Sequence, residues 1–238
     1  MEVGIGLETS TGQSIGWLST RRELTPEGLR VDFEVRLPPG AYVLKTPQSS
    51  HHSGFTIPVA IPVDKEELDL GAKTVPIAGA AALRGKPAPE LEVEWRPGQE
   101  KTWEKLRGRV VVIDFWGTWC GPCVAGMPAL MEVHDQFKDK PVEWLSIHTP
   151  NLKTFEEFDR EVAKCEERDW SKKKLPFTAV LDHPVTDQDY SGKTSERYGV
   201  AEWPTLIVVD QQGKVVGPVN KKMLAETITQ LLEKGDAK

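Results

Sequence analysis

The segment 110–123 constrains this chain more than any other, because an apolar run leads directly into a Cys-x-x-Cys pair. The run is interrupted only by Asp114, which is typical of a strand covered on both faces. Apolar residues then recur at helical spacing over residues 121–138, so Cys120 is predicted to lie at the start of a helix. Unpaired backbone N–H groups and the positive end of the helix dipole favour a thiolate there. A fall in thiol pKa from ~8.5 to ~7 corresponds to roughly 2 kcal/mol of thiolate stabilisation.

The second cysteine, Cys123, lies one helical turn after Cys120, near enough to close a disulfide, and is predicted to be less exposed. This asymmetry suits an attacking thiol and a resolving thiol. Pro122 fits the first turn of the helix, where its missing N–H costs nothing. An inert disulfide or half of a zinc site is the alternative. Cys165 is the only further cysteine, which is too few for a four-cysteine zinc site.

Composition and charge exclude several classes of protein. The 238 residues are 39% hydrophobic with a net charge of −6, which indicates a folded chain of one large or two modest domains. The longest basic run, residues 172–174, is too short for a nucleic-acid or anionic-membrane surface. No apolar stretch approaches the ~20 residues that cross a bilayer, and the first residues lack the start of a signal peptide. We therefore expect either a cytoplasmic protein or one whose targeting segment lies outside this chain.

Residues 1–82 are predicted to form an antiparallel β-sandwich-like module followed by a linker. Its strands are predicted over residues 31–37, 41–44 and 55–63. Pro58 and Pro62 both lack an N–H on the same side of the third strand, so this strand is expected at a sheet edge. The small-residue stretch 71–86 is the expected linker. Residues 37–44 resemble the turn of carboxypeptidase-regulatory-like β-sandwich modules.

Residues 83–238 alternate strand and helix patterns, which predicts an α/β domain with a mixed central sheet and helices on both faces. The strands are predicted over residues 110–115, 142–148, 177–181, 205–209 and 214–216. The helices are predicted over residues 121–138, from a capping box at Thr154 and Glu157, just before Tyr198, and from Asn220 to Gly235.

Five short motifs accompany the cysteines in this second part. They are Gly-Lys-Pro-Ala-Pro at 85–89, Asp-Phe-Trp at 114–116, Met-Pro at 127–128, Tyr-Gly-Val at 198–200 and Trp-Pro-Thr at 203–205. Together with Trp-Cys-Gly-Pro-Cys at 119–123, they resemble the thioredoxin superfamily. The closer resemblance is to its TlpA/ResA-like branch of extracytoplasmic thiol–disulfide oxidoreductases. This resemblance implies a thioredoxin-like fold for residues 83–238.

The resemblance also implies a substrate-binding surface. The family fold places a cis proline opposite the active-site disulfide, and by position this is Pro204. The backbone of Trp203 would then pair with an extended substrate segment. Trp119, Gly121 and Pro122, which flank the thiols, complete the implied surface.

Asp114 matches the buried acid that lies behind the inner cysteine in thioredoxins. Burial raises a carboxyl pKa, so Asp114 is predicted to accept the proton that Cys123 loses. A buried Asp that is simply bonded to backbone is the alternative. Two departures from the family pattern weaken the proton-transfer role. Residues 142–148 lack the lysine that thioredoxins place near this acid, and Gly126 stands where TlpA/ResA-like chains often carry a Glu.

The resulting hypothesis is a thiol–disulfide oxidoreductase that reduces protein disulfides through a mixed disulfide. The redox-active pair Cys120–Cys123 needs no added cofactor or metal. Its expected partners are a protein disulfide substrate and an upstream thiol reductant. The family implies an extracytoplasmic, periplasmic setting and allows a membrane tether outside this chain. The competing hypothesis is a binding or adaptor protein in which the disulfide is structural or idle.

Overall fold

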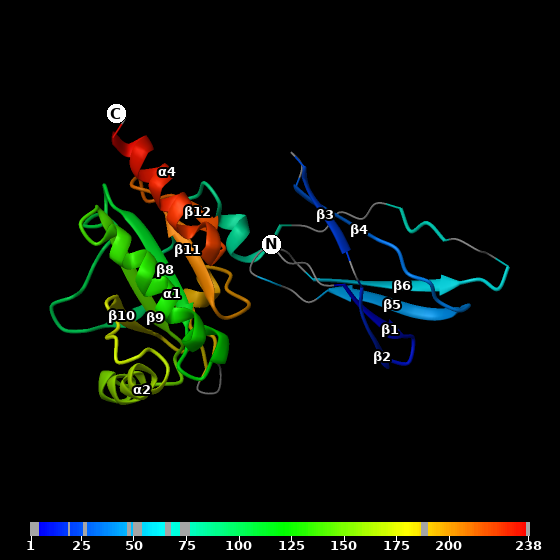
Figure 1. The fold of residues 1–238 in the computed structure, drawn as a ribbon, viewed down its shortest axis with the longest axis horizontal. Coiled ribbons are helices and arrows are strands. Elements are labelled where there is room, and N and C mark those ends of the chain that lie inside the picture. Colours follow the sequence, from blue (N-terminus) through cyan, green and yellow to red (C-terminus); the bar gives the residue numbers. More distant parts are fainter. Residues whose placement is uncertain are drawn as a thin grey trace. The chain divides into compact units, whose positions relative to one another are not determined.

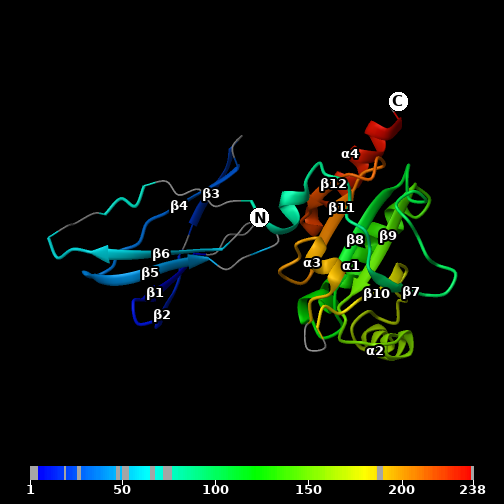
Figure 2. The ribbon, with the colours of Figure 1, turned by 180° about the vertical axis from the view of Figure 1, so that it is seen from behind.

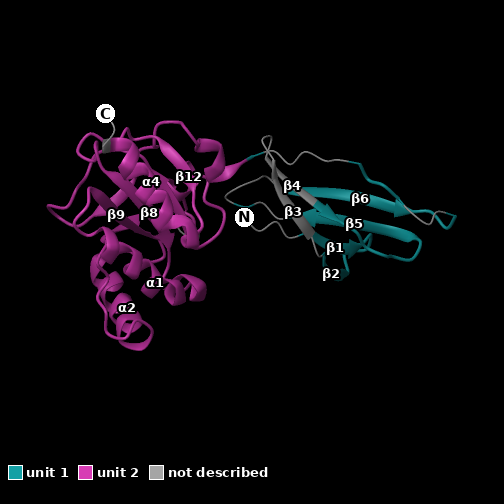
Figure 3. Cartoon of the chain, turned by 45° about the horizontal axis from the view of Figure 1, so that its top comes forward, with its two compact units in different colours: residues 1–77 teal, residues 78–238 magenta. Residues whose placement is uncertain are grey.

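The computed structural model describes residues 5–18, 20–25, 28–46, 49, 54–64, 68–71, 77–186 and 190–236. The chain divides into two compact units, Met1–Ile77 and Ala78–Lys238 (Figure 3). The first four residues, on which the signal-peptide expectation rests, lie outside the described residues, as do residues 72–76 of the predicted linker. Each unit has a hydrophobic core of its own.

The first unit is all-β, as predicted. Its strands are β1 Ile5–Thr9, β2 Ser14–Leu18, β3 Thr20–Thr25, β4 Gly28–Phe33, β5 Gly40–Thr46 and β6 Phe55–Ile61. Four of them form an antiparallel sheet in the order β2-β1-β5-β6, and β3 pairs with β4 as a hairpin (Figure 1). Leu7, Leu44 and Val59 belong to its small core. Face-to-face packing of two sheets, which a sandwich requires, stays a prediction.

Some predicted elements near this unit are confirmed and others are wrong. The expected edge strand is confirmed, since β6 pairs only with β5 among the described strands. The strand predicted over residues 31–37 is too long, because β4 ends at Phe33, where its pairing with Thr20 ends. The linker prediction is wrong at η1, a 3-10 helix over Gly79–Leu83. Ala80 of η1 is buried in the core of the second unit, which its small side chain allows.

The second unit has the predicted thioredoxin-like α/β fold. Its strands are β7 Val93–Trp95, β8 Val110–Trp116, β9 Val142–His148, β10 Thr178–Asp182, β11 Thr205–Val209 and β12 Val215–Pro218. Its helices are α1 Gly121–Phe137, α2 Phe155–Arg168, α3 Lys193–Arg197, η2 Lys221–Met223 and α4 Leu224–Asp236. The sheet order is β12-β11-β8-β9-β10-β7. β8, β9 and β10 run parallel, and the other pairings are antiparallel, so the sheet is mixed.

Helices cover both faces of this sheet (Figures 1 and 2). Side chains of α1, α2 and α4 share one core, and η1 and the residues that follow α3 contribute to the core on the other face. β8 lies in the middle of the sheet and sends Val112 and Trp116 toward α1 and Ile113 toward the opposite core. This double coverage explains the nearly continuous apolar run. By the same alternation, Asp114 faces α1.

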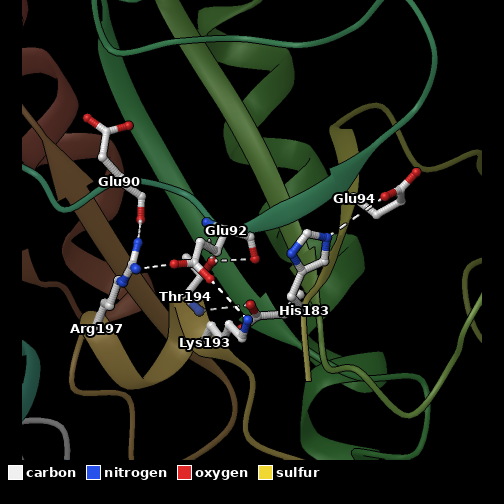
Figure 4. Close-up of polar contacts among 8 residues, drawn as sticks. Glu90, Glu92, Glu94, His183, Lys193, Thr194 and Arg197 are labelled. Carbon is white, nitrogen blue, oxygen red and sulfur yellow. Dashed lines mark hydrogen bonds and ion pairs between the residues drawn. The ribbon is translucent and has the colours of Figure 1, made fainter. Parts of the chain in front are cut away.

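β7 is missing from the element order that the sequence predicts. It has only three residues and forms by antiparallel pairing with β10. The chain before it is tied to α3 (Figure 4). The Glu92 N–H donates to Thr194 Oγ1 at 2.9 Å, and that hydroxyl donates to the Glu92 carbonyl at 3.0 Å. Arg197 and Lys193 pair with the Glu92 carboxylate. These long-range contacts hold the segment before β7 against α3.

The helix ends follow their predicted caps with small differences. The Thr154 hydroxyl accepts from the Glu157 backbone N–H at 3.2 Å. The Glu157 carboxylate accepts from the Lys153 backbone N–H instead of the Thr154 N–H, so only half of the capping box forms. Asn220 caps η2, which leads into α4, and Gly235 lies in the last turn of α4 instead of after it. None of the helices in the described part of the chain combines the length and apolarity needed to cross a membrane.

Candidate active site

The paired cysteines form a disulfide at the N-terminus of α1. Their sulfurs are 2.08 Å apart and their Cα atoms 5.2 Å apart. Cys120 is the N-cap residue, and its Sγ accepts a hydrogen bond from the Cys123 N–H at 3.3 Å. In the dithiol form a Cys120 sulfur at this place faces the same amide donor and the positive end of the helix dipole. Both favour the thiolate.

The two cysteines differ less in exposure than predicted. Cys120 is 5% exposed and Cys123 is 4% exposed in the disulfide form. The exposure of the residues that follow them differs more. Cys120 is followed by the exposed residues Gly121 and Pro122, whereas Cys123 is followed by the buried Val124. The outer cysteine is therefore the one beside accessible backbone.

His148 at the end of β9 holds the loop that precedes the disulfide. Its Nε2 accepts from the Thr118 backbone N–H at 2.9 Å, and its Nδ1 lies 2.8 Å from the Thr149 carbonyl oxygen, to which it donates. Only the neutral tautomer with a proton on Nδ1 serves both contacts. Burial lowers the pKa of His148 to about 4, although the bond to the Thr149 carbonyl opposes the fall. The ring therefore stays neutral and keeps the loop in place at physiological pH.

Trp119 stands next to the disulfide and is fixed by a chain of hydrogen bonds. Its Nε1–H donates to Thr149 Oγ1 at 2.9 Å, and that hydroxyl donates to Asn151 Oδ1 at 2.7 Å. Gly117 makes the arrangement possible, because a Cβ there would lie 2.4 Å from Trp119 Nε1 and 2.8 Å from Thr149 Oγ1. The tryptophan is still 46% exposed.

The loop before β11 lies against the same tryptophan. The Trp203–Pro204 peptide bond is cis, as the resemblance implies. The Trp203 ring is 6.0 Å from the Trp119 ring, centroid to centroid. Pro204, like Gly121, is exposed. The structure thus brings the predicted substrate-binding residues to one end of the sheet, and their contact with a substrate stays a prediction.

Asp114 is a buried carboxyl on the face of β8 that α1 covers. Burial raises the pKa of Asp114 to about 7, and the nearby Lys221 ammonium opposes that rise. A carboxyl with this pKa exchanges its proton near neutral pH, as proton transfer to or from a thiol requires. Its role in that transfer stays a prediction.

Lys221 places a cation near Asp114, whereas the next strand in the sequence, residues 142–148, has no lysine. Its Nζ donates to the Gly126 carbonyl oxygen at 3.2 Å. A Cβ at position 126 would lie 2.9 Å from that Nζ. This one contact therefore involves both departures from the family pattern. Lys221 supplies a positive charge that residues 142–148 lack, and it binds the backbone of Gly126. Sequence reasoning missed Lys221 because no local motif marks it.

Other residues near the site have simpler roles. Cys165 is buried in the core on the α1 side, and burial raises the pKa of its thiol. Among the described residues, no group of three or more His, Cys, Asp or Glu side chains is arranged to hold a metal ion. Tyr190 was not predicted to belong to the site, yet its ring lies 4.8 Å from that of Trp119.

The comparison with protein families agrees with this geometry. The model of the Redoxin family matches residues 83–230, which include both cysteines and the Trp203–Pro204 pair. The chain belongs to the Redoxin family. The match extends over most of the second unit and leaves the first unit outside the family.

Curated relatives of this Redoxin chain carry related names. Thiol-disulfide oxidoreductase ResA of Geobacillus thermodenitrificans is 32% identical over 153 residues, which cover 64% of this chain and 78% of ResA. ResA of Bacillus thuringiensis subsp. konkukian is 29% identical over 150 residues, 63% of this chain and 77% of that protein. With its cysteine pair and these relatives, the chain is a thiol–disulfide oxidoreductase.

A solved structure matches the fold. It is the solution structure of a candidate protein disulfide isomerase from Bacteroides thetaiotaomicron, with a TM-score of 0.50 and 19% identity. The match covers 65% of this chain and 92% of that chain.

Proposed function

We propose that this Redoxin-family chain reduces disulfides in protein substrates, with Cys120 as the attacking thiol and Cys123 as the resolving thiol. The observation that carries the proposal is the position of Cys120 Sγ at the N-cap of α1, 3.3 Å from the Cys123 N–H. No other cysteine in the second unit shares these features, because Cys165 lies inside α2, away from its N-terminus, and forms no disulfide.

The first step is attack by the Cys120 thiolate on one sulfur of the substrate disulfide. An S–S bond forms between Cys120 and the substrate, the substrate S–S bond breaks, and one substrate thiolate leaves. The substrate segment lies along Trp203 and Pro204, beside Trp119, Gly121 and Pro122. Pairing with the Trp203 backbone holds it in an extended conformation.

The second step is attack by Cys123 on the Cys120 sulfur. The Cys123 thiol gives its proton to the Asp114 carboxylate, the intramolecular disulfide forms, and the second substrate thiolate leaves. The leaving thiolates take up protons, so two electrons pass from the protein dithiol to the substrate. The pKa of Asp114, raised by burial to about 7, suits it to hold the proton in transit.

Each turnover leaves the chain oxidised, so a thiol reductant must reduce Cys120–Cys123 again. We place this exchange outside the cytoplasm, in the setting that the TlpA/ResA-like resemblance implies, where a membrane tether outside this chain would hold it near its reductant. The first unit would position the catalytic unit or contact a partner.

The proposal is tested by measuring insulin reduction and the reduction potential of the cysteine pair. We expect turnover with dithiothreitol as the reductant, its loss in Cys120→Ser, and full turnover in Cys165→Ser. The expected potential lies below about −150 mV, toward the thioredoxin end of the range. An idle structural disulfide, as in an adaptor protein, would give no turnover in any form. A potential above that limit would make the chain an oxidant.

A further inference from the structure

We propose that Trp119, Tyr190 and Trp203 form an aromatic surface that selects substrate segments with a large apolar side chain two residues from the target cystine. Tyr190 is the residue that sets this preference. The inference rests on the proposed function and adds to it the class of polypeptide that the enzyme prefers. Tyr190 acts here on substrate choice and takes no part in the electron transfer.

The three rings come from three separate segments of the second unit. Trp119 precedes α1, Tyr190 lies between β10 and α3, and Trp203 precedes β11. The Trp119 ring lies between the other two, 4.8 Å from Tyr190 at 53° and 6.0 Å from Trp203 at 63°. These are the tilted geometries that aromatic rings prefer. The rings therefore form one continuous surface that begins at the residue before Cys120.

This aromatic surface is open to solvent. Tyr190 is 54% exposed and Trp119 is 46% exposed. Two other large aromatic residues of the same unit, Trp116 and Trp170, are fully buried. Contiguous exposed aromatic rings next to a reactive group are typical of a recognition surface, since they bury a large apolar area at low entropic cost.

Backbone contacts anchor the chain just after Tyr190. Gly192, two residues further on, forms a β-bridge with Pro184. The Lys193 N–H donates to the His183 carbonyl oxygen at 2.8 Å (Figure 4). These bonds limit the movement of the chain next to Tyr190, which lowers the entropy lost on binding.

A second set of bonds fixes the start of α3, which follows this part of the chain. The buried Asp182 carboxylate accepts from the backbone N–H groups of Thr194 and Ser195, each at 2.9 Å. Gly192 permits this close approach, because a Cβ there would lie 2.2 Å from the Asp182 Cγ. Burial raises the pKa of Asp182, and the two amide donors oppose the rise.

The position of the surface identifies its occupant. Successive side chains of an extended segment point to opposite faces, and alternate ones lie about 7 Å apart on the same face, so a substrate whose sulfur reaches Cys120 places the side chain two residues away over Trp119 and Tyr190. Rings of this kind attract aromatic and large aliphatic side chains and offer no charge partner to acidic ones. The occupant is therefore a cystine-bearing polypeptide with a large apolar residue two positions from the cystine.

The test uses two synthetic peptides of equal length, each with one cysteine held as a mixed disulfide with glutathione. The residues two positions before and two positions after the cysteine are Phe in one peptide and Ser in the other. With dithiothreitol regenerating the dithiol, and the rate without enzyme subtracted, we expect the full chain to reduce the Phe peptide about three to ten times faster, as kcat/KM, with the difference in KM. In Tyr190→Ala this ratio falls below about twofold, and in Tyr190→Phe it is kept. Trp17→Ala, which removes an exposed tryptophan of the first unit, keeps the ratio and is the matched control.

The outcomes separate this inference from the proposed function. Equal rates for the two peptides in the wild-type chain, or an unchanged ratio in Tyr190→Ala, would overturn the aromatic surface and leave the reductase intact. Failure to reduce either peptide would overturn both. Sedimentation of the same proteins gives a second readout. A dimer that Tyr190→Ala dissociates would assign the surface to a second copy of the chain and would also overturn the inference.

Discussion

The imidazole of His148 accepts a hydrogen bond from the Thr118 backbone N–H across 2.9 Å and so links the end of β9 to the loop that carries the disulfide. The same ring lies edge-on to Trp116, with 5.2 Å between centroids. One buried side chain therefore orients the backbone leading to Cys120 and packs against the core beneath it.

His148→Phe is expected to lower the free energy of unfolding by about 1–3 kcal/mol, because phenylalanine keeps the ring contacts but leaves the Thr118 N–H without an acceptor. Urea unfolding of the oxidised protein measures this change. His183→Phe, at a half-exposed histidine whose ion pair with Glu94 spans 3.8 Å, is the control and should change stability by less than about 1 kcal/mol. Equal losses in the two variants would contradict the role given to His148.

The pH dependence of stability should separate Asp114 from His148, because their pKa shifts act in opposite directions. Burial raises the pKa of Asp114 to about 7, so between its ordinary value and pH 7 the native state holds a proton that the unfolded chain has lost. This contribution makes stability fall as pH rises. Burial lowers the pKa of His148 to about 4, so between pH 4 and its ordinary value the unfolded chain holds the extra proton. That contribution makes stability rise with pH.

The two slopes oppose each other over pH 4.5–6.5 in the wild-type protein, a window set by the two pKa values. Relative to wild type, Asp114→Asn should make the slope more positive and His148→Gln more negative, each by up to about 1.4 kcal/mol per pH unit. Urea unfolding at several pH values gives the slopes. Variants whose slopes match wild type would show that neither group has the protonation state described.

Lys221 should lower the pKa of the Asp114 carboxyl by its charge. Lys221→Met is therefore expected to raise this pKa above about 7, since the carboxylate loses a nearby cation. Carbon-13 NMR titration of the oxidised protein follows the carboxyl directly. Lys222→Met removes the neighbouring charge on the same short helix and should leave the titration in place. A titration that moves equally in both variants would assign the effect to net charge and not to Lys221.

Gly117→Ala should displace Trp119. The new Cβ would stand 2.4 Å from Trp119 Nε1, so either the ring or the loop must move and the bond to Thr149 breaks. We expect a loss of about 1–3 kcal/mol in stability and a change in tryptophan fluorescence. Gly121→Ala is the matched control for stability, because a Cβ there meets nothing within 4 Å. A Gly117→Ala protein as stable as Gly121→Ala would contradict the close packing of this loop.

Much of the second unit could be predicted from sequence, because its signals are local. The apolar run of β8, the Thr154 cap of α2 and the hairpin between β11 and β12 each follow from neighbouring residues. β7 could not be predicted, since its three residues form a strand only by pairing with β10. For the same reason the small residues of the stretch 79–83 predict a linker, although Ala80 is buried by contacts made far along the chain.

The candidate site likewise contains residues that the sequence predicts and residues that it does not. The cysteines lie in one contiguous motif that predicts their pairing, and the family resemblance implies the cis peptide bond at Pro204. Lys221 and Tyr190 could not be found, because each reaches the site across a tertiary contact with no motif around it. Sequence analysis identifies the reacting cysteines of such a site but not the residues that reach it from distant parts of the chain.

The central claim, that Cys120 attacks and Cys123 resolves, is tested most directly by trapping the intermediate. Cys123→Ser should accumulate a mixed disulfide with a cystine-bearing substrate such as insulin, and mass spectrometry of the tryptic digest should place the new bond at Cys120. Cys120→Ser should trap no such species, because Cys123 lies inside the first turn of α1 and is followed by the buried Val124, without the exposed residues that follow Cys120. A bond formed through Cys123, or insulin turnover that survives the loss of Cys120, would contradict the account.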